Sequence, residues 1–424
     1  MKILREKNLI LLSIAQFISL FGDRLNNMAL VGILGSYYSQ STFVFSGLAI
    51  FIALPSILLS PISGIIADKL NRKKIMITIE ILRAIIVFLI PFIFIKFKSI
   101  LLIYFLIFLL YSLTLPFNNA KMASIPQIVN NIYTANAFLN ITGRLSIALG
   151  ILFGGVIVDL YIWQKLGFEG WQIAFYIDSL TYLISALIIA FITFEEQKKT
   201  NFEFHQIIEE ERSFIKKIID DFKFGLVYIS KDKFLSFIFK CITLTMLIIS
   251  ISYNVYLPYF QQNLGFGTKG IGILGGFLGI GFIIGSFLFP IIAKKIGEIK
   301  IILISHIIFP LLFISSIFVS NFFALMILFS IGGFILSNLL ISYDTFIQAV
   351  SDDSVRGRLF SFKEFIWSFS FLIFVFLIGI LGEILKFFFK FESVIKLIIL
   401  ITSIIIISLN LVFFNNLKSK SINQ

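Results

Sequence analysis

Long apolar segments separated by short polar segments dominate the pattern of this chain. Each apolar segment has about 20 residues or more, the length that an α-helix needs to cross the hydrocarbon core of a bilayer. The pattern therefore predicts an all-α membrane protein with two sets of six membrane-spanning helices. The predicted helices occupy residues 9–36, 43–67, 75–95, 99–120, 135–160 and 171–193, and then 234–260, 270–293, 299–319, 322–345, 358–381 and 393–414.

The longest polar segment separates the two sets of helices and carries the densest charge in the chain. Its apolar residues recur at helical spacing, and charged residues fill the opposite face. Such a segment is typical of an amphipathic helix that lies on a membrane surface. We therefore expect three parts: a six-helix bundle at 1–194, an amphipathic linker at 195–233 and a second six-helix bundle at 234–424.

Composition supports the membrane assignment and limits the classes of function. The chain is 58% hydrophobic and 14% charged, and a soluble protein of this size could not bury so much apolar surface. With two histidines, one cysteine and no phosphate-binding glycine-lysine-serine motif, the sequence predicts no enzyme, no cofactor and no metal site. The net charge of +12 lies in short loops, so we expect it to set membrane orientation and not to bind nucleic acid.

Basic residues are concentrated on one side of the predicted helices, and this bias places that side in the cytoplasm. They are Lys2, Arg5, Lys7, Lys69, Arg72, Lys73, Lys74, Lys198, Lys199, Lys294, Lys295, Arg356, Arg358, Lys418 and Lys420. Both termini are then cytoplasmic. The basic start leads into an apolar run without a small-residue cleavage site, so we expect no cleaved signal peptide.

The segment between the second and third predicted helices carries the most specific motif. Residues 64–74 read Gly-Ile-Ile-Ala-Asp-Lys-Leu-Asn-Arg-Lys-Lys, which resembles the cytoplasmic loop between helices 2 and 3 of the major facilitator superfamily. The matching residues are Gly64, Asp68, Lys69, Arg72 and Lys73. Asn71 replaces the usual glycine, and asparagine is the best non-glycine residue for a left-handed backbone position.

Further segments extend the resemblance to the branch of bacterial efflux permeases that includes macrolide exporters and the enterobactin exporter. They are residues 80–84, 125–129, 174–179 and 355–358. Residues 150–155 resemble the antiporter signature, with Ile151 in place of its proline, and Gly154 and Gly155 keep the capacity for close helix packing. The resemblance implies two pseudo-symmetric six-helix bundles, alternating access, a bacterial inner membrane and a monomer. It also implies that Asp68 helps to hold the bundles together near Arg356 and Arg358.

Asp23 is the first candidate for a functional residue, because ionisable groups inside a membrane are costly to bury. It lies about 14 residues into the first predicted helix, or about 21 Å along it. The resemblance implies that this helix lines the central cavity, so we predict that Asp23 accepts the coupling proton. A structural ion pair with Arg24 or with a neighbouring helix is the alternative.

Other polar residues extend the predicted cavity, and their aromatic and neutral character in the second half suits a large amphipathic ligand. The predicted substrate contacts are Gln16, Asn26, Asn27, Arg144, Tyr253, Asn254, Tyr256, Asn338 and Trp367. Arg144 has three possible roles: it complements Asp23, binds an anionic substrate group or stabilises the first bundle. We expect Glu80 and Arg83 to form a structural ion pair, and Asp178 to be structural as well.

These residues predict proton-coupled efflux of a hydrophobic or amphipathic small molecule. A lysophospholipid transporter without a coupling ion would use the same apolar cavity. A divalent metal exporter is a further alternative, because Gly22-Asp23-Arg24 resembles the start of ferroportin-like carriers, although scarce histidine and cysteine argue against it. A receptor or scaffold on a transporter fold is the non-transport alternative.

The predicted orientation can be tested with single cysteines in a Cys241→Ser background. Leu70→Cys, Glu196→Cys and Lys420→Cys should each resist a membrane-impermeant maleimide in intact cells and react after the cells are opened. Labelling of any of the three in intact cells would reverse the assignment.

Overall fold

The computed structural model describes residues 7–38, 41–69, 71–128, 132–193, 223, 227–351 and 353–421. Within these ranges, side chains are described except at 60–62, 64–69, 126–128, 132–134, 136–137, 353–358, 361 and 415–421. The predicted amphipathic helix at 207–222 lies outside the described residues. The boundaries predicted at 194 and 233 therefore stay a prediction.

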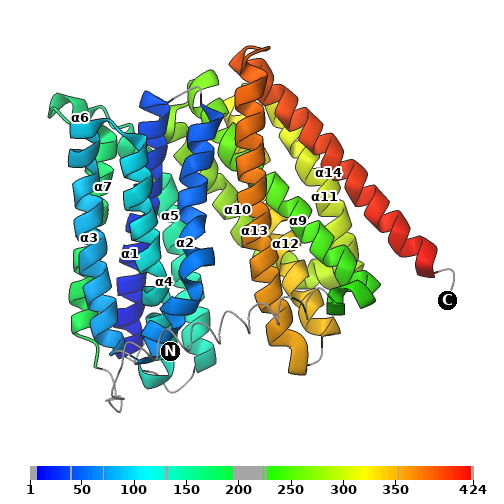
Figure 1. Cartoon of the computed structure of the whole chain (residues 1–424), viewed down its shortest axis with the longest axis horizontal. Helices are drawn as coiled ribbons and strands as arrows, with labels where there is room; N and C mark the ends of the chain where they lie inside the picture. Colours follow the sequence, from blue (N-terminus) through cyan, green and yellow to red (C-terminus); the bar gives the residue numbers. More distant parts are fainter. Residues whose placement is uncertain are drawn as a thin grey trace. The chain divides into compact units, whose positions relative to one another are not determined.

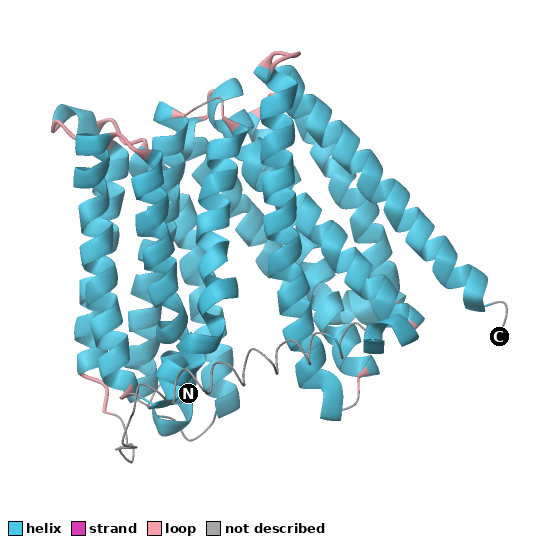
Figure 2. Cartoon of the chain, viewed as in Figure 1, coloured by secondary structure: helices cyan, strands magenta, loops and turns pink. Residues whose placement is uncertain are grey.

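Helices and short loops make up the described chain (Figures 1 and 2). The first set is α1 (Lys7–Tyr37), α2 (Thr42–Lys69), α3 (Arg72–Phe97), α4 (Ile100–Ile128), α5 (Ile132–Val158), α6 (Ile162–Lys165) and α7 (Gly170–Ala190). The second set is α9 (Lys233–Ile251), the π-helical turns η2 (Ser252–Tyr256) and η3 (Tyr259–Asn263), α10 (Gly267–Ile296), α11 (Glu298–Ile317), α12 (Phe322–Val350), α13 (Asp353–Lys386) and α14 (Phe391–Ser421). Within the described ranges, 12 helices are long and apolar enough to cross a membrane, as the sequence predicted.

Several helices continue beyond the apolar segments that predicted them. The helix predicted at 99–120 is α4, which runs to Ile128, so Lys121 lies inside a helix and not in a loop. The helix predicted at 234–260 becomes π-helical around Pro258 and ends at Asn263. Hydropathy predicts which part of a helix lies in the hydrocarbon core of the bilayer. The helix itself ends where another group satisfies its terminal amides and carbonyls. Asn71, for example, begins α3 by accepting a hydrogen bond from the Lys74 amide at 3.0 Å, and its φ of −63° shows that the left-handed position expected from the motif is wrong.

The described residues group into two compact units. Unit 1 holds α1, α2 from Phe51 onwards, α3 to α7, and the first residues of α10, Gly267–Gly272. Within it, α1 packs against α5 and α7, and α3 packs against α4 and α7. Unit 2 holds the start of α2 up to Ile50, together with α9 and the helices from Ile273 onwards. Within it, α9 packs against α13 and α14, and α11 packs against α12 and α14.

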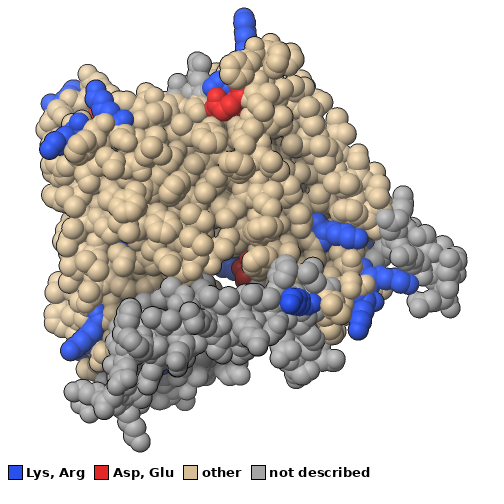
Figure 3. Space-filling view, in the orientation of Figure 1, with Lys and Arg blue, Asp and Glu red and all other residues tan. Residues whose placement is uncertain are grey.

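Apolar side chains form the core of each unit and also its surface. Large residues such as Leu101 and Phe287 are exposed, as expected for helices that contact lipid. On the face drawn in Figure 3, most charged side chains lie toward the helix ends and leave an apolar band between them. This distribution fits the length and hydropathy of the helices.

The start of α10 packs closely on α5 within unit 1. A Cβ atom added to Gly155 would lie 2.6 Å from the Cα atom of Gly272, so the two backbones touch there, which confirms the close packing predicted for Gly155. One helical turn further along, the Lys269 amide donates to the Asp159 carboxylate at 2.6 Å. Burial raises the pKa of Asp159, although hydrogen bonds from Lys269 and Thr268 oppose this effect.

The contact between α5 and α10 predicts a steric effect at Gly155. Gly155→Ala should destabilise the protein by roughly 1–3 kcal/mol, because the new methyl group meets backbone that cannot rotate away. Gly332→Ala is the matched control, since a Cβ atom there meets only the Phe309 ring at 3.9 Å. Thermal unfolding of the purified protein in detergent compares them. Equal melting temperatures for the two variants would show that the helices do not touch at Gly155.

Candidate functional site

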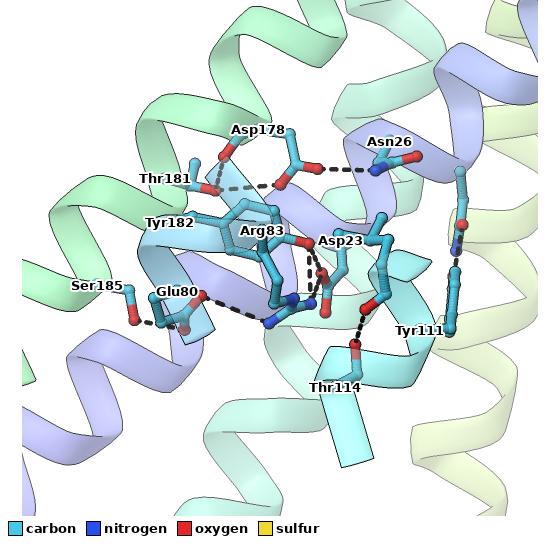
Figure 4. A network of polar contacts seen from close by, with 12 residues as sticks. Asp23, Asn26, Glu80, Arg83, Tyr111, Thr114, Asp178, Thr181, Tyr182 and Ser185 are labelled. Atoms are coloured by element: carbon cyan, nitrogen blue, oxygen red, sulfur yellow. Dashed lines mark hydrogen bonds and ion pairs between the residues drawn. The ribbon is translucent and has the colours of Figure 1, made fainter. Parts of the chain in front are cut away.

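A network of charged and polar side chains connects α1, α3 and α7 inside unit 1 (Figure 4). Its centre is the guanidinium group of Arg83 on α3, which is almost fully buried. The Arg83 Nη2 atom lies 2.6 Å from Asp23 Oδ1 on α1, and Nη1 lies 3.4 Å from Glu80 Oε2 one helical turn away. Asp23 therefore pairs with a neighbouring helix and not with the adjacent Arg24.

Residues of α7 complete the surroundings of this ion pair. The Tyr182 hydroxyl donates to Asp23 and accepts from Arg83 Nη2 at 2.8 Å, and the guanidinium carbon lies 4.2 Å from the Tyr182 ring centroid. Ser185 donates to Glu80 at 2.9 Å. The guanidinium group thus has a stacked ring on one side and oxygen acceptors at its edges, which suits its planar shape.

A third carboxylate, Asp178 on α7, lies next to this group. Asn26 Nδ2 on α1 donates to Asp178 Oδ2 at 3.0 Å, and Thr181 donates to Oδ1 at 3.3 Å. A Cβ atom on Gly22 would lie 2.3 Å from Asp178 Oδ1, so only glycine lets α1 approach α7 this closely. Asp178 and Glu80, which the sequence predicted to be structural, therefore lie in the same network as Asp23.

The network contains more negative than positive groups. Two carboxylates, Asp23 and Glu80, pair with one guanidinium group, and a third carboxylate, Asp178, lies beside them. Glu80 and Asp178 are 0% exposed, whereas the Asp23 side chain is 16% exposed. Uncompensated charge is costly in a low-dielectric interior, so protonation of a carboxyl group lowers that cost by reducing the excess of negative charge. Asp23 is therefore the partly exposed carboxylate of the cluster.

Other predicted cavity residues of unit 1 lie near the network or on α5. Tyr111 on α4 donates to Asn27 Oδ1 at 3.0 Å. Gln16 Nε2 donates to the Leu139 carbonyl at 2.8 Å, and Gln16 and Arg144 line one pocket of about 240 Å³. The structure thus brings Gln16 and Arg144 together, separately from Asp23, Asn26 and Asn27.

The predicted contacts of unit 2 are directed mainly into its own packing. Asn254 donates to the Val375 carbonyl at 2.7 Å, and Tyr256 donates to the Phe313 carbonyl at 2.8 Å. Asn338 donates to Phe334 of its own helix at 2.8 Å. The two remaining residues, Tyr253 and Trp367, are half-buried. As substrate contacts, all five stay predictions.

Two cations of the predicted cytoplasmic motif bind helix carbonyls in unit 1. Lys73 donates to the carbonyls of Ala190 and Ile192 at 2.7 and 2.8 Å, at the C-terminal end of α7, where a cation is favourable. Arg72 donates to the Ala123 carbonyl at 2.6 Å. The side chains of the other motif residues lie outside the described set, so their role in a gate stays a prediction. They are Asp68, Lys69, Arg356 and Arg358.

Sequence reasoning missed one partner of Arg83 and two lysines within the membrane-spanning helices. It paired Arg83 with Glu80 alone, because Asp23 and Arg83 are 60 positions apart in the chain and local spacing does not reveal their contact. It ended α4 at residue 120 and so overlooked Lys121. It also overlooked Lys363 on α13, which pairs with Asp344 on α12 at 2.6 Å. A lysine near the end of an apolar segment was the available signal for Lys121 and Lys363.

Comparisons with known proteins agree with this architecture. A family model described as Major Facilitator Superfamily matches residues 12–320. BacE of Bacillus subtilis (strain 168), named as a candidate bacilysin exporter, is 30% identical over 274 residues, which are 64% of this chain and 63% of BacE. The crystal structure of the nucleoside transporter NupG shares the fold at 13% identity, with a TM-score of 0.74 over 96% of this chain and 98% of NupG. An inward-facing bacterial homologue of the human lysosomal transporter Spinster has 13% identity and a TM-score of 0.73, over 96% of this chain and 95% of that one.

The ion-pair network predicts that loss of Arg83 alone destabilises the protein more than loss of Arg83 together with Asp23. Arg83→Gln should destabilise the protein by roughly 3–5 kcal/mol, because it leaves buried carboxylates without their partner. Adding Asp23→Asn should recover part of that loss, since the remaining negative charge falls. Chemical unfolding of the four proteins of this double-mutant cycle measures both effects. Lys96→Gln, which removes an exposed cation of α3, is the control. If Arg83→Gln lowered the free energy of unfolding no more than Lys96→Gln does, the network would be refuted.

Proposed function

Because the chain belongs to the major facilitator superfamily, we propose that it exports a hydrophobic or amphipathic small molecule from the bacterial cytoplasm, driven by proton influx. The chain is a multi-pass membrane transporter, and the direction of transport follows its similarity to BacE, which is named as an exporter. The match spans less than two thirds of BacE, so the substrate of BacE is not transferred to this chain.

The observation that carries proton coupling is the partial exposure of Asp23 within a cluster of three carboxylates and one guanidinium group. Asp23 can exchange a proton with solution, while Glu80 and Asp178 are enclosed. When Asp23 is ionised, it binds Arg83 Nη2 and accepts from Tyr182. When it takes up a proton, its charge is lost and the attraction to Arg83 weakens.

This exchange would act on helix packing, because Asp23 lies on α1 and Arg83 on α3. Loss of the Asp23 charge leaves Arg83 with Glu80 on its own helix, so the link between α1 and α3 weakens while the guanidinium group stays paired. Proton binding thereby changes the relative stability of two arrangements of α1. A ligand shifts such an equilibrium only by the difference between its affinities for the two states. Here the ligand is the proton, and it binds Asp23 more weakly in the arrangement in which Asp23 pairs with Arg83.

The structure gives no specific support to metal export. Among the described residues, no group of three or more histidine, cysteine, aspartate or glutamate side chains is arranged to hold a metal ion. The three carboxylates of the network face Arg83, Tyr182, Ser185, Asn26 and Thr181 instead. These contacts therefore favour export of an organic molecule over export of a metal ion.

Transport by reconstituted protein tests the role of Asp23. In proteoliposomes with an imposed pH gradient, wild-type protein should move an amphipathic dye such as N-phenyl-1-naphthylamine against its concentration gradient. Asp23→Asn should abolish this uphill transport but retain dye exchange without a gradient, because the amide keeps the shape and loses the titrating group.

Glu392→Gln is the matched control, since Glu392 forms a surface pair with Lys396. Uphill transport by Asp23→Asn at the wild-type rate would exclude Asp23 as the coupling group. Parallel uptake assays with a lysophospholipid and with manganese test the two alternatives, a lysophospholipid transporter and a metal exporter. Lysophospholipid movement by the wild-type protein without a pH gradient would favour the lysophospholipid transporter.

A further inference from the structure

The pocket that contains Gln16 and Arg144 has a second cation in its wall. This pocket of about 240 Å³ is formed by α1, α4 and α5, all within unit 1. Its polar residues are Gln16, Lys121, Asn140 and Arg144, and Leu20 and Met122 are among its apolar ones. None of the described residues that line it is acidic. The pocket therefore combines two positive charges with an apolar wall.

Both cations belong to membrane-spanning helices, where an ionisable residue marks a functional site by default. Lys121 is only 9% exposed, and its ammonium group lies 5.8 Å from the centroid of the Phe117 ring. Among the described side chains, no carboxylate lies within ion-pair distance of Lys121. An aromatic face compensates a buried ammonium group only in part. Lys121 is therefore poised to receive an anion.

Two described carboxylates of unit 1, those of Asp23 and Glu80, make their hydrogen bonds and ion pairs to other residues. The described contacts of Asp23 and Glu80 are to Arg83, Tyr182 and Ser185. An anion that enters the pocket from outside the protein would meet Lys121 without competition from an acidic side chain of the wall.

The rest of the pocket is organised to hold a ligand. The Gln16 carboxamide is held by the Leu139 carbonyl at 2.8 Å, so its orientation is set before a ligand binds. A Cβ atom on Gly143 would lie 2.9 Å from Gln16 Nε2, so glycine at this position lets α1 and α5 approach each other. Preorganised polar groups beside an apolar wall are typical of small-molecule sites. The volume suits one end of an amphipathic molecule.

We infer that this pocket is the anion subsite of the transported substrate, which is then an amphipathic organic anion. Its carboxylate, sulfonate or phosphate group would bind Lys121 and Arg144, and its apolar body would contact Leu20 and Met122. This inference rests on the proposed export function and narrows its substrate class. The choice of an anion over a neutral molecule follows from the two cations of the pocket wall.

Binding of two matched dyes tests the subsite without any transport step. The anionic 8-anilino-1-naphthalenesulfonate and the neutral N-phenyl-1-naphthylamine differ in the sulfonate group. Full-length protein in phosphatidylcholine nanodiscs should bind the anionic dye at least about tenfold more tightly, the effect of one charge-assisted hydrogen bond. Equilibrium dialysis against empty nanodiscs corrects for dye in the lipid.

The variants separate the subsite from general binding. Lys121→Gln with Arg144→Gln should lose about tenfold or more in affinity for the anionic dye and keep its affinity for the neutral one. Lys96→Gln, outside the pocket, should keep both affinities, and neutral-dye binding shows that each variant is folded. Equal affinity of wild-type protein for the two dyes, or unchanged anionic-dye binding by the double variant, would overturn the inference.

A lipid headgroup is the other source of such an anion. Nanodiscs that contain phosphatidylglycerol should leave dye binding unchanged if the pocket serves the substrate. Loss of anionic-dye binding in those nanodiscs, dependent on Lys121 and Arg144, would assign the pocket to lipid and overturn the substrate class. Neither outcome alters proton-driven transport or its loss in Asp23→Asn. Failure of the anion subsite in the binding assays is therefore distinguishable from failure of the proposed export function in the transport assays.

Discussion

The burial of one guanidinium group among three carboxylates constrains the whole of unit 1. Charge is expensive inside a membrane protein, and it persists only where partners compensate it. Arg83 has those partners on three helices: Asp23 on α1, Glu80 on its own α3, and Tyr182 on α7. Because α1 packs on both α5 and α7, the position of Asp23 is linked to most of the unit. A proton that neutralised Asp23 would therefore act on helix packing and not on an isolated side chain.

Unit 2 is held together mainly by uncharged hydrogen bonds. His306 is fully buried and lies 3.1 Å from the Thr245 hydroxyl and 3.3 Å from the Tyr343 hydroxyl, while Asn254 binds a carbonyl of α13. Neutral pairs satisfy buried polar groups at a smaller desolvation cost than ions do. Its described ion pairs each have a partly exposed partner, which reduces that cost, and in the pair between Lys363 and Asp344 the aspartate side chain is 45% exposed. The concentration of buried charge in unit 1 is why we assign both the proton and the substrate anion to it.

The sequence predicted what depends on local pattern. Apolar length located the 12 membrane-spanning helices of the described ranges, and an isolated carboxylate inside α1 made Asp23 a candidate. It could not reveal the contact with Arg83, because tertiary packing alone brings together residues that are 60 positions apart. Helix ends were less predictable, since hydropathy falls before the backbone hydrogen bonding of a helix stops. That difference moved Lys121 from a presumed loop into the wall of a pocket. In unit 2, a polar residue such as Asn254 was identifiable, but the direction of its side chain was not.

In the proposed mechanism, the carboxyl cluster around Arg83 holds an exchangeable proton. Infrared difference spectroscopy of the reconstituted full-length protein observes this directly, through the carbonyl stretch of a protonated carboxyl group and its shift in D₂O. We expect such a band at neutral pH, its loss as the pH is raised, and a clear change in the band in Asp23→Asn. The absence of any protonated-carboxyl band across this titration, with all three carboxylates ionised throughout, would contradict the claim.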